Sequence, residues 1–106
     1  MQDLKETCRL ALVQASPVMF DKAASLKKAL TWIENSAAQG AELVVFPELF
    51  LPGYPFGMTF GFKVGSRDEE GRKDWKLYYD NSVVCPGAET EALGAAAKKH
   101  HIYLSI

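Results

Sequence analysis

The sequence has little that would suit a secreted, membrane-embedded or nucleic-acid-binding protein. Its 106 residues include only two cysteines, Cys8 and Cys85, too few for a disulfide scaffold. No stretch approaches the roughly 20 consecutive apolar residues of a membrane helix. The polar residues 1–9 do not resemble a signal peptide. The net charge of −1 predicts no basic surface for nucleic acid or membranes. We therefore predict a soluble, cytoplasmic protein.

The proportions of hydrophobic and charged residues are those of an ordinary globular domain. Hydrophobic residues make up 48% of the chain and charged residues 24%, which favours one folded unit with a modest core. No repeat, linker or low-complexity tract divides residues 1–106. A single disulfide between the two cysteines is one interpretation, although unpaired thiols in a reducing cytosol fit the pattern better.

The first half of the chain predicts two strands joined by a helix. Residues 9–15 and 42–46 each contain an unbroken apolar run, which is typical of strands covered on both faces. Residues 22–39 have a helical period, with Asp21 as the N-cap and Gly40 as the C-terminal glycine. One face of this helix carries the apolar positions Leu26, Leu30, Ile33 and Ala37. The unit is of the βαβ type, with both strands in one sheet.

The second half predicts two helices and a third strand. Residues 66–69 match a capping box before a helix over residues 68–81, and a second helix spans residues 89–100. One face of the helix over residues 68–81 is expected to carry Trp75, Tyr78 and Tyr79. The packing face of the helix over residues 89–100 is expected to carry Leu93, Ala96 and Ala97. Residues 101–106 begin a strand without a following turn or polar tail, so we expect the domain to continue. The predicted class is α/β, in the order strand-helix-strand-helix-helix-strand.

Between the halves, residues 47–57 (PELFLPGYPFG) are predicted to form a rigid, irregular loop. Three prolines and two glycines exclude regular structure there. Its large apolar side chains are expected to pack against the molecule, namely Leu49, Phe50, Leu51, Tyr54 and Phe56.

Glu48, in this loop, is the candidate catalytic residue. Ligands of open α/β sheets bind outside the carboxyl ends of the strands, and Glu48 lies two residues beyond Phe46, the last apolar residue of its predicted strand. Among prolines and aromatic rings its carboxylate is expected to lose water, which would suit a general base. A helix cap or a structural ion pair is the alternative role, and placement alone does not exclude it.

Four segments resemble the nitrilase superfamily of carbon–nitrogen hydrolases, in the right order. LVVFPELFLPGYP (residues 43–55) resembles its first catalytic segment, and LALVQASPV (residues 10–18) its first strand and loop. VGSRDEEGR (residues 64–72) is similar to a stretch of the nitrilase branch, and VCPGAETEALGAAAKKHHIYLSI (residues 84–106) to the turn, helix and strand that follow. The resemblance covers residues 8–106, and it implies that residues 1–106 are the amino-terminal portion of a carbon–nitrogen hydrolase domain.

The resemblance implies an α-β-β-α sandwich and a Glu-Lys-Cys triad that works without a cofactor or a metal. Glu48 would be the triad glutamate, which takes the proton of the cysteine thiol so that the thiolate attacks a nitrile and forms a thioimidate. The products would be a carboxylic acid and ammonia. Tyr54 matches a tyrosine near the substrate pocket, although packing of the loop explains it equally well.

The triad is incomplete in these residues. The family's lysine and cysteine lie beyond residue 106, and neither Cys8 nor Cys85 matches the nucleophile. Lys63, Lys73 and Lys76 likewise match no catalytic lysine. We therefore expect this chain alone to be inactive. His100 and His101 fit a helix C-terminus better than a metal site.

Two alternatives to a nitrilase stay open. The same triad serves amidases, although residues 64–72 favour a nitrilase. The chain could instead be a non-catalytic assembly module, because a half-sandwich must cover its exposed sheet face. The expected partners are a small nitrile or amide substrate and further copies of the same chain, with no nucleic acid and no membrane.

Overall fold

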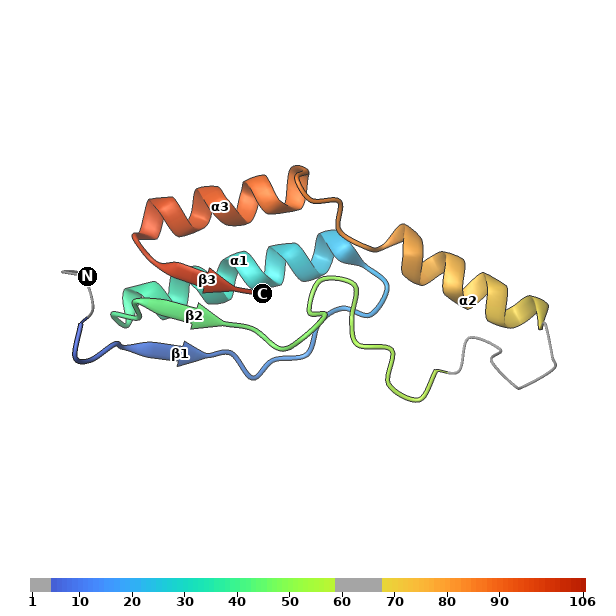
Figure 1. Ribbon diagram of the computed structural model, residues 1–106, viewed down its shortest axis with the longest axis horizontal. Helices are drawn as coiled ribbons and strands as arrows, with labels where there is room; N and C mark the ends of the chain where they lie inside the picture. The colour runs from blue at the N-terminus through green and yellow to red at the C-terminus, as the bar shows by residue number, and fades with distance from the viewer. Residues whose placement is uncertain (1–4, 59–67) are drawn as a thin grey trace.

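The computed structural model describes residues 5–58 and 68–106 and has the predicted order of elements (Figure 1). The elements are β1 (Leu10–Leu12), α1 (Lys22–Ala38), β2 (Leu43–Val45), α2 (Glu69–Asp80), α3 (Ala88–His100) and β3 (Tyr103–Ser105). The predicted α/β class is confirmed. Each strand is shorter than the predicted segment that contains it.

The three strands form one parallel sheet in the order β1-β2-β3. In its register, Ala11, Val44 and Leu104 lie side by side across the sheet. Helices α1 and α3 pack against each other over the side that carries these three residues (Figure 1). β1, α1 and β2 thus form the predicted parallel unit, and β3 adds a further parallel strand on the other side of β2.

The hydrophobic core lies between the sheet and these two helices. Ala29, Ile33 and Val44 are completely buried there. The predicted apolar faces of both helices are confirmed, since Leu26, Leu30, Ala37, Ala96 and Ala97 pack around the buried residues. The helices therefore use their apolar faces as the sequence predicts.

The opposite face of the sheet, which the apolar runs predict to be covered, is exposed in the described residues, as expected for half of a sandwich. Leu12 is 72% exposed and Tyr103 80% exposed, and Leu10 is also exposed. The physical reason is that α1 and α3 lie on the same side of the sheet. No element within residues 5–58 and 68–106 covers the other side.

Both predicted caps of α1 are confirmed. The carboxylate of Asp21 accepts a hydrogen bond from the Ala24 N–H at 2.9 Å, as an N-cap should. Gly40 has a φ of +87° and donates its N–H to the Ala37 carbonyl at 2.9 Å. A side chain at Gly40 would also displace the end of the Arg9 side chain. Glycine is therefore required where the chain turns from α1 into β2.

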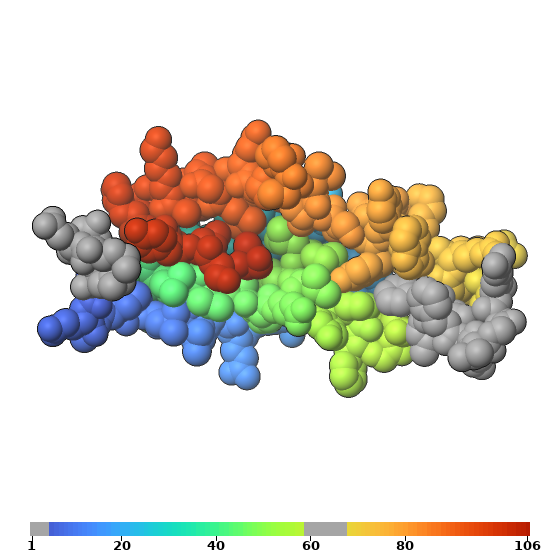
Figure 2. Space-filling model, in the orientation of Figure 1, coloured from blue at the N-terminus to red at the C-terminus, as the bar shows by residue number. Residues whose placement is uncertain are grey.

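Helix α2 extends toward one end of an elongated molecule (Figures 1 and 2). Its N-cap is Asp68, whose carboxylate accepts from the Glu70 N–H at 3.0 Å. The expected capping box begins at Ser66, which lies outside the described residues. Trp75 and Tyr79 stack with ring centroids 5.2 Å apart and are exposed, so the predicted aromatic face is not a packing face as a whole.

Neither cysteine forms a disulfide. Cys8 and Cys85 are both free and exposed, so the alternative of unpaired thiols is confirmed and a bridge is not formed. Among the helices that the structure describes, none is long and apolar enough to cross a membrane.

Candidate active site

Glu48 follows the carboxyl end of the central strand, as predicted. The Val13 N–H donates to the Val45 carbonyl at 2.8 Å, and the Phe46 N–H donates to the Ser105 carbonyl at 2.8 Å. The end of β2 is thus held from both neighbouring strands immediately before Pro47 and Glu48. This is the edge at which parallel sheets bind ligands.

A tight turn holds the backbone around Glu48. Leu49 has a φ of +54°, which is unusual for a residue with a side chain, and its carbonyl accepts from the Gly53 N–H at 3.0 Å. Phe50 is buried, with its ring 5.0 Å from that of Phe46. A left-handed residue beside a candidate catalytic group is a local strain that the surrounding packing must hold in place.

The loop after β1 supports this turn from behind. The Phe20 N–H donates to the Pro52 carbonyl at 3.1 Å. Gly53, with a φ of +90°, lies so close to Met19 that a side chain there would collide with it. The two loops therefore form one packed unit, and the prediction that residues 47–57 contain no regular element is confirmed.

Ser25 ties the supporting loop to α1. Its hydroxyl, completely buried, accepts from the Val18 N–H at 2.9 Å and donates to the Val18 carbonyl at 3.0 Å. Sequence analysis missed this residue. The available signal was its spacing, because Ser25 precedes the buried Ala29 and Ile33 by four and eight residues and so lies on the buried face of the helix.

The expectation that Glu48 is shielded from water is wrong for the described residues, because its side chain is exposed. Tyr54 is also exposed, at 53%, and Phe56 more so. Of the five large apolar side chains that were expected to pack, the loop directs only Phe50 and Leu51 into the core. The sequence correctly placed Glu48 at the strand end, but it did not show which loop side chains point inward.

Tyr78, on α2, is a third residue of the site, and sequence analysis assigned it only to a helix face. Burial raises the pKa of the Tyr78 phenol. The negative charges of the ionised Tyr54 and Glu48 raise this pKa further, because they oppose the formation of another negative charge on the Tyr78 oxygen. The Tyr78 ring also packs edge to face on Phe20, with centroids 6.1 Å apart. Tyr78 therefore lies close enough to Tyr54 and to Glu48 for their charges to oppose its ionisation.

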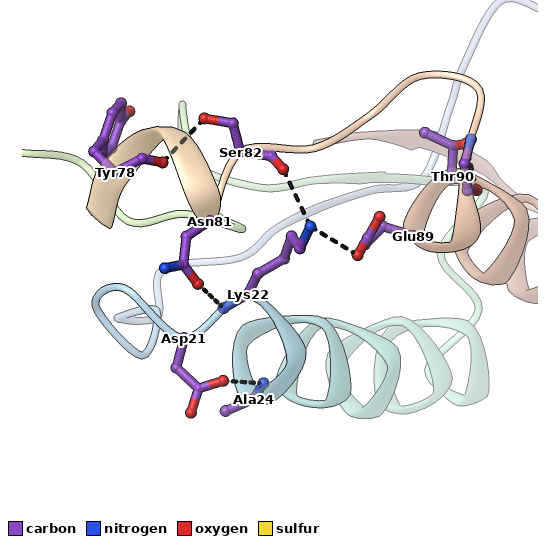
Figure 3. A network of polar contacts seen from close by, with 9 residues as sticks. Asp21, Lys22, Ala24, Tyr78, Asn81, Ser82, Glu89 and Thr90 are labelled. Carbon is purple, nitrogen blue, oxygen red and sulfur yellow. Dashed lines mark hydrogen bonds and ion pairs between the residues drawn. The ribbon is translucent and has the colours of Figure 1, made fainter. Parts of the chain in front are cut away.

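A polar network fixes the end of α2 that carries Tyr78 (Figure 3). The Lys22 ammonium lies 3.2 Å from the Glu89 carboxylate and donates to the Ser82 carbonyl at 3.1 Å. The Lys22 N–H donates to the Asn81 side-chain oxygen at 3.1 Å, and the Ser82 hydroxyl donates to the Tyr78 carbonyl at 3.0 Å. The starts of α1 and α3 thus hold the end of α2 in position.

The structure places the other described residues that were weighed for the triad, Cys8, Lys73 and Lys76, at exposed positions. Cys8 precedes β1 and lies near Glu42, at the amino ends of the strands and so at the edge opposite Glu48. Lys73 pairs with Glu70 and Lys76 with Asp80, all on exposed positions of α2. Lys63 lies outside the described residues.

No group of three or more metal-binding side chains that could hold an ion is found in the part of the chain that the structure describes. His100 and His101 end α3, and His101 takes the left-handed conformation, with a φ of +53°. This position agrees with the predicted role at a helix C-terminus.

Comparison with known proteins gives a consistent result. The family model for carbon–nitrogen hydrolases matches residues 9–106. The chain is 44% identical over 98 residues to nitrilase 1 of Arabidopsis thaliana, and 42% identical over 98 residues to a bifunctional nitrilase/nitrile hydratase of Nicotiana tabacum. It is 43% identical over 98 residues to an aliphatic nitrilase of Sinorhizobium fredii. Each match covers 92% of this chain but only 28%, 28% and 32% of the respective relative.

Proposed function

The chain belongs to the carbon–nitrogen hydrolase family, and from this premise we propose that it is the amino-terminal part of a nitrilase. The complete enzyme converts a nitrile and two waters into a carboxylic acid and ammonia. Glu48 is its general base. The observation that carries this proposal is the position of Glu48 on a braced turn at the carboxyl end of the central strand.

In the proposed mechanism, Glu48 removes the proton of a cysteine thiol that these 106 residues do not supply. The thiolate forms a C–S bond to the nitrile carbon, and the nitrogen takes up a proton to give a thioimidate. Water adds to this carbon and ammonia leaves, so that a thioester remains. A second water releases the acid and regenerates the thiol. A lysine, also from outside these residues, stabilises the charge that develops on the substrate.

The exposure of Glu48 is compatible with this role. A carboxylate that must meet a thiol from another part of the protein has to be accessible in the segment described here. Arrival of that part would displace water from Glu48, which favours proton transfer to the carboxylate. The braced turn supplies the fixed geometry that general-base catalysis requires.

The test is Glu48→Gln in the full-length protein, with ammonia release from phenylacetonitrile as the readout. Loss of a general base lowers the rate by about 10²- to 10⁴-fold. Glu34→Gln is the matched control, because Glu34 is an exposed carboxylate on α1, away from the strand ends. Wild-type rates in Glu48→Gln would disprove the proposed role.

The isolated chain offers a second test. We expect no ammonia release from it, since it lacks the proposed nucleophile. Turnover that persists after Cys8 and Cys85 are both replaced by serine would show that the chemistry does not use a cysteine of the proposed kind.

The choice of a nitrile over an amide rests on residues 64–72 and on the names of the similar proteins. Comparing phenylacetonitrile with phenylacetamide on the full-length protein tests it. A strong preference for the amide would assign the enzyme to the amidases instead.

We also propose that the uncovered sheet face packs against a second sheet in an α-β-β-α sandwich, and that the complete protein is a cytoplasmic homo-oligomer. The exposed Leu10, Leu12 and Tyr103 support the first statement, because water-exposed apolar sheet faces are unfavourable. Light scattering of the full-length protein at several concentrations tests the oligomer. A folded monomer at every concentration would contradict it.

A further inference from the structure

Lys22 lies at a junction of three helices and is unusually shielded for a lysine. It is the first residue of α1, and its side chain is only 24% exposed. Its ammonium lies 3.2 Å from the carboxylate of Glu89, near the start of α3 (Figure 3). The same ammonium donates to the carbonyl of Ser82, just beyond α2, at 3.1 Å. These contacts indicate a residue that joins elements of the fold.

Lys22 also holds the end of α2 through its backbone. Its N–H donates to the side-chain oxygen of Asn81, the C-cap of α2, at 3.1 Å. The Asn81 amide in turn donates to the Leu77 carbonyl at 3.0 Å. Carbonyl groups at a helix C-terminus lack partners within the helix, so such contacts fix its last turn. Lys22 therefore ties this turn twice, once through Asn81 and once through Ser82.

Tyr78 belongs to the last turn of α2 and lies next to the turn that carries Glu48. Its carbonyl accepts from the Ser82 hydroxyl at 3.0 Å. Tyr78 and Leu49, the residue after Glu48, line the same surface pocket. Tyr78 also interacts electrostatically with Glu48. The position of the end of α2 therefore determines whether Tyr78 stays beside the Glu48 turn.

Phe20 completes the route from Lys22 to this turn. It precedes Lys22 by two residues, and its ring packs edge to face on that of Tyr78, with centroids 6.1 Å apart. The Phe20 N–H donates to the Pro52 carbonyl at 3.1 Å. An unbroken series of contacts thus runs from Lys22 through the end of α2, Tyr78 and Phe20 to the loop of Glu48.

We propose that Lys22 is a positioning residue, which keeps Tyr78 beside the Glu48 turn and thereby fixes the general base for the reaction. The inference rests on the proposed function, because it assigns a role toward the same site. Misplacement of a reacting group by about 1 Å can lower a rate by about 10²-fold, so a contact outside the site can control the chemical step. Lys22 acts through other residues, so its effect belongs to kcat and not to KM.

The first experiment is Lys22→Met in the full-length protein, with phenylacetonitrile as the substrate. Methionine keeps an unbranched apolar side chain but removes the ammonium and both of its contacts. We expect kcat to fall by about tenfold or more and KM to change by less than about twofold. Lys27→Met is the matched control, because Lys27 is an exposed lysine on the same helix, and it should leave kcat unchanged. Wild-type kcat in Lys22→Met, or a loss confined to KM, would overturn the proposal.

The second experiment tests whether Lys22 acts through Tyr78. Tyr78→Leu removes the ring that packs on Phe20, so it should also lower kcat. Adding Lys22→Met to Tyr78→Leu should then lower kcat by no more than about twofold further, because effects within one contact network are not additive. Two independent effects that multiply would overturn the proposed route, and so would wild-type kcat in Tyr78→Leu.

Hydrogen exchange in the full-length protein separates this inference from the proposed function. The Gly53 N–H closes the Glu48 turn by donating to the Leu49 carbonyl, so its exchange rate reports opening of the turn. Lys22→Met should raise this rate by about tenfold, and Lys27→Met should not change it. Faster exchange supports the inference even if the protein hydrolyses no nitrile, in which case only the proposed function fails. An unchanged rate would overturn the inference even if hydrolysis is observed.

A milder variant keeps the test decisive if Lys22→Met does not fold. Removal of one partner from a shielded ion pair can be strongly destabilising. Asn81→Ala removes the acceptor of the Lys22 N–H but leaves the ion pair with Glu89 in place. If circular dichroism shows that Lys22→Met is unfolded, the exchange rate of the Gly53 N–H in Asn81→Ala decides. A faster rate supports the proposal, and an unchanged rate would overturn it.

Discussion

The two faces of the three-stranded sheet have similar residues but opposite environments. Val44 is completely buried beneath α1 and α3, whereas Leu12, on the adjacent strand, is 72% exposed on the other face. Leu10 and Tyr103 share the exposure of Leu12. Because side chains alternate along a strand, both faces come from the same short segments.

This difference shows what an unbroken apolar run encodes. A strand with one solvent-exposed face normally alternates apolar and polar residues, but residues 43–46 (LVVF) do not alternate. The sequence therefore specifies cover on both faces, and the described residues provide it on one. The apolar residues of the exposed face stabilise the described structure little, and their effect should appear only when a second layer covers them.

The largest expected effect comes from a pair of substitutions that remove side chains of equal size, one from the buried core and one from the exposed face of the sheet. Ile33→Ala removes a completely buried side chain and should lower the free energy of unfolding by about 2–5 kcal/mol, through lost burial and a cavity. Leu12→Ala, on the exposed face, should change it by no more than about 0.5 kcal/mol. Urea unfolding of the 106-residue chain, followed by circular dichroism, measures both.

A large effect of Leu12→Ala in this chain would contradict the comparison, since it would mean that another copy already covers the face. Light scattering under the same conditions would identify that copy. In the full-length protein, by contrast, Leu12→Ala should become clearly destabilising if a second sheet covers it.

An intermediate effect is expected from Ser25→Ala, on the buried side. The substitution leaves the N–H and carbonyl of Val18 without their hydroxyl partner, which should lower the free energy of unfolding by about 1–3 kcal/mol. Thr31→Ala is the control, because this exposed hydroxyl bonds only within its own helix. If the two variants had equal stability, the hydroxyl of Ser25 would not be holding the loop behind the Glu48 turn.

The fold could be predicted largely because its signals are local and periodic. The apolar period of α1, its Asp21 cap and Gly40 are read from neighbouring residues, and the structure confirms each. The packing stripe of α3 follows the same rule. The apolar runs predict that both faces of the sheet are to be covered, but they do not tell which layer lies on which face.

The site could be predicted only in part, for a related reason. Glu48 was found because strand ends are marked by sequence and the segment resembles a known family. Tyr78 was missed because its proximity to Glu48 arises from the fold and not from spacing along the chain. The exposed Glu48 and the buried Phe50 flank one left-handed residue, Leu49, which is not a residue type that predicts such a conformation.

The smallest expected effect on stability concerns the ion pair between Lys22 and Glu89, at the starts of the two helices that cover the sheet. The pKa of Glu89 is lowered first by a hydrogen bond from its own backbone N–H and then by Lys22. A carboxyl group whose pKa is lower in the folded state adds stability above its unfolded pKa of about 4.3, and this contribution disappears as the pH falls through the folded value. Glu89→Gln should therefore be less stable than the wild type at pH 7, and this difference should shrink as the pH falls below about 4.3.

Urea unfolding over a series of pH values from 7 downward measures the convergence, with Glu91→Gln, an exposed carboxylate on the same helix, as the control. A stability difference that does not shrink as the pH falls would mean that Glu89 acts through packing and not through its charge.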